Sequence, residues 1–199
     1  MTRHKSHDER REEILEAAKR CFLREGYQRT RMDDVAREAG LSKGGVYFHF
    51  PSKRDIFDAL HGAEIDRNMA LIAQLDDVEA SLAEQLTRLA SNLVAYFGGN
   101  EEHRRFLIVL AEMGMQDEAV HQRIVASHVR YTEAIAQMIE RAQARGELRE
   151  GIDAHALALY LKLLVDGLEQ GFALGYPIDV ERLIPTAMQM IALGLRPDP

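Results

Sequence analysis

Apolar residues recur at helical spacing along almost the whole chain, in segments separated by glycine, proline or acidic residues. We find no strict alternation of apolar and polar residues, which would indicate a half-buried strand, and no internal repeat or low-complexity segment. The pattern therefore predicts an all-α fold of about nine helices. The expected helices cover residues 8–25, 31–39, 43–50, 53–75, 82–98, 101–115, 117–145, 153–174 and 179–195.

Residues 30–52 contain start and stop signals for two short helices in succession. Thr30 can cap the first helix, with Asp33 reaching back to the Thr30 backbone, and Gly40 suits the left-handed residue that ends it. Ser42 is a fresh N-cap, and Pro51 stops the second helix. Two short helices joined by a tight turn form a helix-turn-helix, whose second helix enters the DNA major groove.

The second short helix has the chemistry of a DNA-contacting element. Gly44 and Gly45 each cost about 1 kcal/mol relative to alanine, but their bare backbone allows a close approach to a groove wall. The alternative is a loop and helix with incidental glycines, which the capping signals on three consecutive elements disfavour. The groups suited to phosphate oxygens are the side chains of Lys43, Tyr47 and His49 and the backbone N–H groups at the Ser42 end.

A longer pattern surrounds these residues. It reads Gly26-Tyr27-x-x-Thr30, then Val35-Ala36-x-x-Ala39-Gly40-Leu41-Ser42-Lys43-Gly44-x-Val46-Tyr47-x-His49-Phe50-x-Ser52-Lys53. Over roughly residues 8–60 it resembles the DNA-binding domain of the TetR (tetracycline-repressor-like) family. The resemblance implies a homodimeric, ligand-responsive transcriptional regulator, most often a repressor.

The resemblance also implies roles for individual residues. Lys43, Tyr47, His49 and Lys53 match positions that usually touch DNA phosphate. The position of Gly45 often reads bases and frequently carries threonine in the family. The expected DNA contacts are Arg31, Ser42, Lys43, Gly44, Gly45, Tyr47, His49 and Lys53.

The segment 153–174 is apolar nearly all round, which indicates a helix buried on more than one side. One side can pack on its own domain and the other on a second subunit, forming a four-helix interface with the preceding helix 117–145. The alternative is a central core helix in a monomer. Helix-turn-helix proteins commonly read two half-sites with two-fold symmetry, which favours the dimer. The expected interface residues are Leu157, Leu161, Leu164, Leu168 and Gly171.

The segment between residues 69 and 172 is rich in methionine and aromatic side chains, which suit an adaptable apolar pocket for a small-molecule effector. Ordinary core filling is the alternative for any one of them. Glu112 stands inside an apolar run, and if buried it would need an arginine or a cationic ligand as its partner. The expected pocket residues are Met69, Phe97, Phe106, Leu110, Met113 and Phe172.

Charge is distributed unevenly along the 199 residues. The net charge is −7, yet residues 1–60 hold 13 Lys and Arg against 11 Asp and Glu, a net of +2. The acidic remainder can orient the molecule on DNA by repulsion.

The single cysteine, Cys21, fits a reducing cytoplasm and is expected to be a buried apolar residue. No signal peptide or membrane-spanning segment is expected, so no membrane partner is either.

Other chemistry finds little support. The acidic pairs Asp76-Asp77, Glu101-Glu102 and Asp117-Glu118 stand at or just before expected helix starts, where capping explains them. Ser81 and Glu84 form a capping box at another helix start. His121 and His128 lie seven residues apart, which does not match a zinc helix, and no catalytic motif is present. We therefore expect no metal site, no cofactor and no enzymatic activity.

The expected organisation is a DNA-binding domain over residues 1–52, whose linking helix continues to about residue 60, and an effector and dimerisation domain over 53–199. Alternatives are an activator of the same fold, or a helical ligand-binding protein or enzyme that does not use its helix-turn-helix.

Overall fold

The computed structural model describes residues 6–75 and 80–195, apart from a few side chains within helices. These residues contain helices and no strand, which confirms the all-α prediction for this part of the chain. The helices are α1 (His7–Glu25), α2 (Met32–Glu38), α3 (Lys43–His49), α4 (Lys53–Leu75), α5 (Leu82–Gly99), α6 (Glu101–Gln116), α7 (Glu118–Ala144), α8 (Ala154–Ala173) and α9 (Val180–Leu195).

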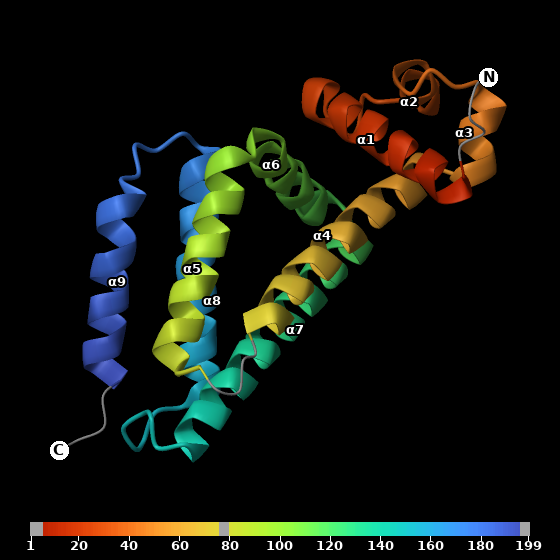
Figure 1. The fold of residues 1–199 in the computed structure, drawn as a ribbon. Helices are drawn as coiled ribbons and strands as arrows, with labels where there is room; N and C mark the ends of the chain where they lie inside the picture. Colours follow the sequence, from red (N-terminus) through yellow and green to blue (C-terminus); the bar gives the residue numbers. More distant parts are fainter. Residues whose placement is uncertain (1–5, 76–79, 196–199) are drawn as a thin grey trace.

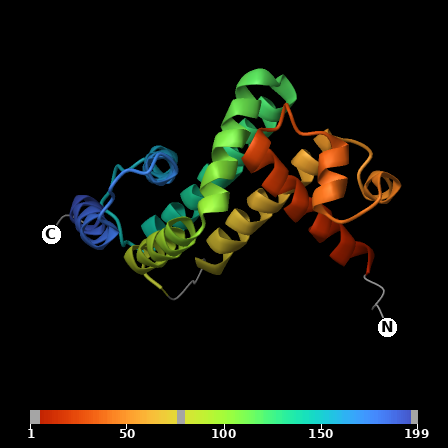
Figure 2. The same ribbon diagram turned by 90° about the horizontal axis from the view of Figure 1, so that it is seen from above.

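Two long helices, α4 and α7, run side by side and connect the two ends of the molecule (Figure 1). Helices α1 to α3 gather around the first turns of α4, while α5, α8 and α9 stand at the other end. Seen from above, the N-terminal helices and α9 lie at opposite ends (Figure 2). Any signal between the two ends must therefore pass along α4, α6 or α7.

Side-chain caps define several helix starts. Ser81 and Glu84 form a capping box at α5, in which the Ser81 N–H donates to the Glu84 carboxylate at 2.9 Å. Asp117 caps α7, because its Oδ1 accepts the Val120 N–H at 3.1 Å. Both caps confirm the sequence prediction. The predicted capping role of Asp76 and Asp77 lies outside the described residues.

The N-terminal helices share one apolar core with α4, α6 and the start of α7. Phe22, Val46 and Phe57 are fully buried at the centre of α1 to α4. Phe106 of α6 joins the same cluster, with its ring centroid 6.0 Å from that of Phe57. Cys21 is also fully buried, as predicted, and burial raises the pKa of its thiol. The N-terminal unit is therefore packed against α6 rather than hanging from a flexible linker.

A second core lies among α5, α7 and α8. Ala158 and Leu161 of α8 are buried against Ile139 of α7 and Leu86 of α5. The opposite face of α8 remains apolar but uncovered, so α8 has the two apolar sides that the sequence pattern predicted. In the parts of the chain that the structure describes, no helix combines the length and apolarity needed to cross a membrane.

Candidate DNA-binding surface and ligand cavity

The turn before α2 differs from the prediction by one residue. Thr30 is buried, and its hydroxyl donates to the Gly26 carbonyl at 2.9 Å instead of capping a helix. Helix α2 begins at Met32, and the Asp34 carboxylate accepts the Arg31 N–H at 2.9 Å. The expected pairing of Thr30 with residue 33 is therefore wrong, because the turn already uses the threonine hydroxyl for its own carbonyl.

The start and end signals of α3 are as predicted. Gly40 has φ +65°, the left-handed conformation that ends α2. Ser42 caps α3, since its Oγ accepts the Gly45 N–H at 3.1 Å. Val46 is fully buried and anchors the helix on the core. At the end of α3, Phe50 takes an extended conformation before Pro51.

Three side chains of α3 face outward from this anchor. Lys43 and Tyr47 are exposed, and the Lys43 ammonium lies 6.0 Å from the centre of the Tyr47 ring. Lys43 also pairs with Asp33 of α2 at 2.8 Å. Phe48 is 77% exposed. An exposed aromatic ring on a recognition helix suits apolar contact with a thymine methyl group. Phe48 was not among the predicted contacts, and its position two residues after Val46 was the available signal.

His49 and Lys53 lie partly below the surface. Burial lowers the pKa of His49, and its ring lies 4.5 Å from that of His7, so it is neutral at pH 7. The Lys53 ammonium donates to the carbonyls of Tyr27 at 2.6 Å and Thr30 at 2.8 Å. Lys53 therefore joins α4 to the turn before α2, and the contact of Lys53 or His49 with phosphate stays a prediction.

The two glycines of α3 have different surroundings. A Cβ atom at Gly44 would meet nothing within 4 Å, whereas one at Gly45 would lie 3.3 Å from the Ser42 Oγ. Gly45 therefore leaves room for the helix cap, and Gly44 presents bare, exposed backbone. Arg31, at the start of α2, is exposed on the surface.

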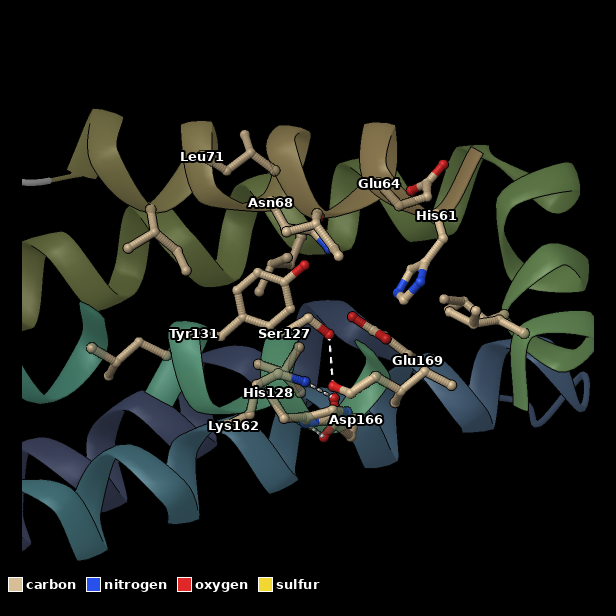
Figure 3. A pocket seen from close by; sticks show the side chains of 18 of the residues that line it. His61, Glu64, Asn68, Leu71, Ser127, His128, Tyr131, Lys162, Asp166 and Glu169 are labelled. Carbon is tan, nitrogen blue, oxygen red and sulfur yellow. Dashed lines mark hydrogen bonds and ion pairs between the residues drawn. The ribbon is translucent and has the colours of Figure 1, made fainter. Parts of the chain in front are cut away.

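A cavity of about 130 Å³ lies among α4, α5, α6, α7 and α8. In Figure 3, His61 and Asn68 reach into it from α4, opposite Tyr131 of α7 and Glu169 of α8, and Glu64 of α4 belongs to the same wall. Aliphatic side chains complete the wall. Its remaining polar residues are Ser127, His128, Lys162 and Asp166.

The structure places only one predicted pocket residue, Leu110, in the wall of this cavity. Phe106 and Met113 are buried in the N-terminal core. Met69 and Phe172 are half-buried and line neither this cavity nor the larger one described below. The Phe97 side chain lies outside the described residues. The predicted residues lie on α4, α5, α6 and α8 but not on α7, and composition could not indicate which helix faces surround the cavity.

Glu112 is exposed on α6, and its Oε1 lies 3.4 Å from the Gln116 amide nitrogen. It therefore needs no buried cationic partner. The acids that line the cavity are Glu64, Asp166 and Glu169, and none of them was among the predicted pocket residues.

Charges compensate Glu64, on the α4 wall of the cavity. Its Oε2 lies 2.9 Å from Nδ1 of His103, a side chain that is only 1% exposed, and 2.9 Å from Nη1 of Arg67. Burial by itself would raise the pKa of Glu64. The His103 hydrogen bond and the charges of His103 and Arg67 outweigh burial and lower that pKa. Glu64 is therefore ionised at neutral pH.

Asp166 is compensated in the same way on α8. It forms an ion pair with Lys162, and His128 Nδ1 lies 3.7 Å away. Burial lowers the pKa of His128 and that of His61, so both rings are neutral at pH 7. Burial raises the pKa of Glu169 to about 7. In the described part of the chain, Glu169 forms no hydrogen bond or ion pair, and Figure 3 draws none to it.

A larger apolar cavity of about 430 Å³ lies between α5, α8 and α9. The predicted dimer contacts all belong to α8, one of the helices around this cavity. Leu161 and Gly171 are buried within the subunit, Leu157 and Leu168 are half-buried, and Leu164 is exposed. The other exposed large apolar side chains of α8 and α9 are Leu159, Tyr160, Leu163, Leu183, Met190 and Leu193.

No group of three or more His, Cys, Asp or Glu side chains among the described residues could hold a metal ion. His121 is exposed and does not line the cavity that His128 lines. The candidate functional features among the described residues are the α3 surface and the two cavities.

Comparisons with known proteins cover both ends of the molecule. Residues 14–60 match the family described as bacterial regulatory proteins, tetR family. Residues 83–184 match the tetracyclin repressor-like C-terminal domain. The first match contains the helix-turn-helix, and the second contains most of the helices around the two cavities.

Individual relatives support the same family assignment. The transcriptional regulator TtgR of Pseudomonas putida is 29% identical over 204 residues, which cover 94% of this chain and 93% of TtgR. The repressor KstR2 of Mycobacterium tuberculosis is 34% identical over 163 residues, covering 82% and 68%. A regulator from Saccharomonospora viridis, solved in complex with choline, is 26% identical with a TM-score of 0.78, covering 95% and 98%. The chain is a member of the tetR family of bacterial transcriptional regulators.

Proposed function

We propose that the protein is a homodimeric repressor, which binds an operator through two α3 helices and is released by a small molecule held in the 130 Å³ cavity. The observation that carries the proposal is the position of α4. Its first turns lie in the core of the DNA-binding helices, at Ile56 and Phe57, and its middle forms one wall of the cavity at His61, Glu64 and Asn68.

The surface of α3 supports DNA binding. Ser42 leaves the first backbone N–H groups of α3 at the exposed end of the helix, next to Lys43 and Tyr47. Helix N-termini and cationic side chains favour phosphate oxygens. The bare backbone of Gly44 allows a close approach to DNA. We assign phosphate contacts to Lys43 and Tyr47 and an apolar base contact to Phe48, while Arg31 extends the positive surface.

The second copy, we propose, covers the outer faces of α8 and α9, and not α8 with α7 as the sequence suggested, because α9 carries the exposed apolar residues Leu183, Met190 and Leu193. Leu163 is 59% exposed, and Met190 on α9 is exposed as well. Burial of apolar area drives association at about 25 cal/mol per Å² before the costs of binding are subtracted. Two-fold symmetry would set the spacing of the α3 helices to match two half-sites in successive major grooves.

In this proposal the ligand changes DNA binding because its affinity differs between two arrangements of α4. In one arrangement the two α3 helices match the operator spacing, and in the other they do not. A ligand that fits the cavity better in the second arrangement releases the DNA. We also propose the domain boundary after residue 52, although the first turns of α4 share the N-terminal core.

Selection of bound sequences from random DNA, followed by titration at several salt concentrations, tests DNA recognition. Lys43→Ala should weaken operator binding and reduce the salt slope by about 1, because one phosphate contact is lost. Tyr47→Ala should weaken binding with the dimer intact. Arg130→Ala removes an exposed charge from α7, far from α3, and should leave the slope unchanged. Unchanged affinity in both α3 variants would refute the proposed surface.

A further inference from the structure

Three carboxylates face the 130 Å³ cavity, and two of them already have cationic partners. Glu64 pairs with His103 and Arg67. Asp166 pairs with Lys162. The third, Glu169, has no hydrogen-bond or ion-pair partner among the described residues. Lys162 lies on the same helix but is paired with Asp166. A carboxylate inside a largely apolar cavity is costly unless a cation or hydrogen-bond donors compensate it.

A second polar atom in the cavity is also left without a partner. The Oδ1 atom of Asn68 is buried and accepts no hydrogen bond from the described residues. Asn68 extends from α4 into the cavity, across from the helices that carry Glu169 and Tyr131 (Figure 3). The Asn68 side chain hydrogen-bonds Tyr131, so its oxygen can meet a ligand only after the amide turns, whereas Glu169 lines the cavity itself. A primary ammonium group carries three donors and one positive charge.

The rest of the cavity does not suit an anion. Lys162 is already paired with Asp166, and burial keeps His61 and His128 neutral at pH 7. A bound carboxylate would therefore face Glu169 with no free cation nearby. The apolar wall includes Leu89, Leu93, Leu107 and Leu110. A cavity of about 150 Å³ lined by such residues holds a benzene-sized group, so 130 Å³ fits one small ring or a short alkyl chain.

We propose that the effector is a small protonated amine with one apolar group, whose ammonium binds the Glu169 carboxylate while the apolar group fills the leucine-lined part of the cavity. This inference rests on the proposed function, because it names the ligand class of the same site. Glu169 is then the residue that distinguishes a cation from a neutral molecule of the same shape.

The site also couples ligand binding to pH. Glu169 must be ionised to pair with the ammonium, and its pKa of about 7 leaves it mostly protonated at pH 6. Affinity for an amine that stays protonated should rise between pH 6 and pH 8, by up to about tenfold as the ionised fraction rises. The charged and titratable groups facing Glu169 are Lys162 and Asp166 on α8, Glu64 and His61 on α4, Tyr96 on α5, and His128 and Tyr131 on α7.

Calorimetry on the full-length protein without DNA tests the inference. The probes are benzylammonium, benzyl alcohol and benzoate, which share a ring but differ in charge. Benzylammonium should bind at least tenfold more tightly than either of the other two, and more tightly at pH 8 than at pH 6. Glu169→Gln should abolish that preference and the pH dependence. Glu112→Gln, the same substitution on the exposed face of α6, should change neither.

Equal affinity for benzyl alcohol, preferred binding of benzoate, no binding of benzylammonium, or an unchanged preference in Glu169→Gln would each overturn the inference. Thermal unfolding of Glu169→Gln confirms that the variant is folded. Operator titration with the same ligands separates the two proposals. Benzylammonium that binds without weakening DNA affinity contradicts the ligand response but not the amine site. Operator release by another class of molecule, with no amine binding, contradicts the amine site alone.

Discussion

The guanidinium of Arg54, in the first turn of α4, donates a hydrogen bond to the carboxylate of Asp117, the residue that caps α7. Arg54 also pairs with Asp58 at 2.9 Å, and Asp58 pairs with Arg123 of α7 at 2.6 Å. These ion pairs attach the start of α4 to the start of α7. They lie between the DNA-binding helices and the cavity, so they belong to the path that would join the two.

A double-mutant cycle of Arg54→Ala and Asp117→Asn measures this attachment. Asparagine keeps the helix cap but removes the charge, so the effect of Arg54→Ala on the free energy of unfolding should be smaller in the Asp117→Asn background. The backbone hydrogen bond from Val120 and the Arg54 contact lower the pKa of Asp117. Its contribution is therefore present above the ordinary value of 3.8 and lost as pH falls through the lower, folded value. Additive effects at pH 7 in chemical denaturation would show that the contact contributes no coupling.

Neutralising Glu169 should stabilise the protein, and only at higher pH. Burial raises its pKa from 4.5 to about 7, so ionisation costs stability as pH rises from 4.5 to 7, and the loss levels off above that. The shift corresponds to an upper limit of about 3 kcal/mol. Without ligand, Glu169→Gln should unfold at higher denaturant concentration than the wild type at pH 8 and at a similar one near pH 4.

The pH dependence of that difference separates desolvation from a general effect of the substitution. Glu112→Gln, on an exposed acid, should show no comparable gain at pH 8. A destabilised Glu169→Gln protein at pH 8 would mean that the carboxylate has a stabilising partner.

Gly44→Ala should have opposite effects on stability and on DNA binding. A methyl group meets nothing within 4 Å, so helix propensity adds about 1 kcal/mol, or roughly 2–4 °C in the unfolding temperature. The same methyl would stand between the backbone and the groove wall, so operator affinity should fall. Thermal unfolding and operator titration on one preparation measure both. Equal operator affinity with the higher unfolding temperature would place Gly44 away from the DNA.

Charged substitutions on α8 and α9 should dissociate the dimer. Leu163→Glu and Met190→Glu each place a carboxylate in the proposed interface, where an unpaired charge is strongly unfavourable. Sedimentation should show monomers for both, and operator affinity should fall with the loss of two-site binding. Val129→Glu puts the same charge on an exposed apolar position of α7 and should remain dimeric. A monomeric Val129→Glu protein with dimeric α8 and α9 variants would move the interface to α7.

Local signals predicted the helices well. Ser42, Ser81 and Asp117 each accept the backbone hydrogen bond that their residue type and position indicated. Gly40 takes the left-handed conformation expected of it. These predictions succeed because a cap depends on residues three or four positions apart. Thr30 shows the limit, since a carbonyl in the preceding turn competes for its hydroxyl.

The cavity was harder to predict because its wall combines five helices. Its acids and histidines are spread from His61 to Glu169, and no spacing rule relates them. The methionines and aromatic residues predicted that an apolar pocket exists, but Phe106 and Met113 are buried in the N-terminal core and do not line it. The exposed state of Glu112 and the enclosed state of Glu169 depend on how α6 and α8 are rotated, which single-sequence periodicity does not determine.

The contact between Phe57 and Phe106 limits how the DNA-reading end can respond. Because these rings belong to one continuous core, α1 to α3 cannot swing on α4 as on a free joint. A shift of α6 or α4 by less than the width of a side chain must therefore move α1 to α3 together as one rigid unit. Over the length of the molecule such a small tilt would be amplified into a larger displacement of α3, so in the proposed dimer a ligand the size of a single ring would be enough to change the spacing of the two α3 helices.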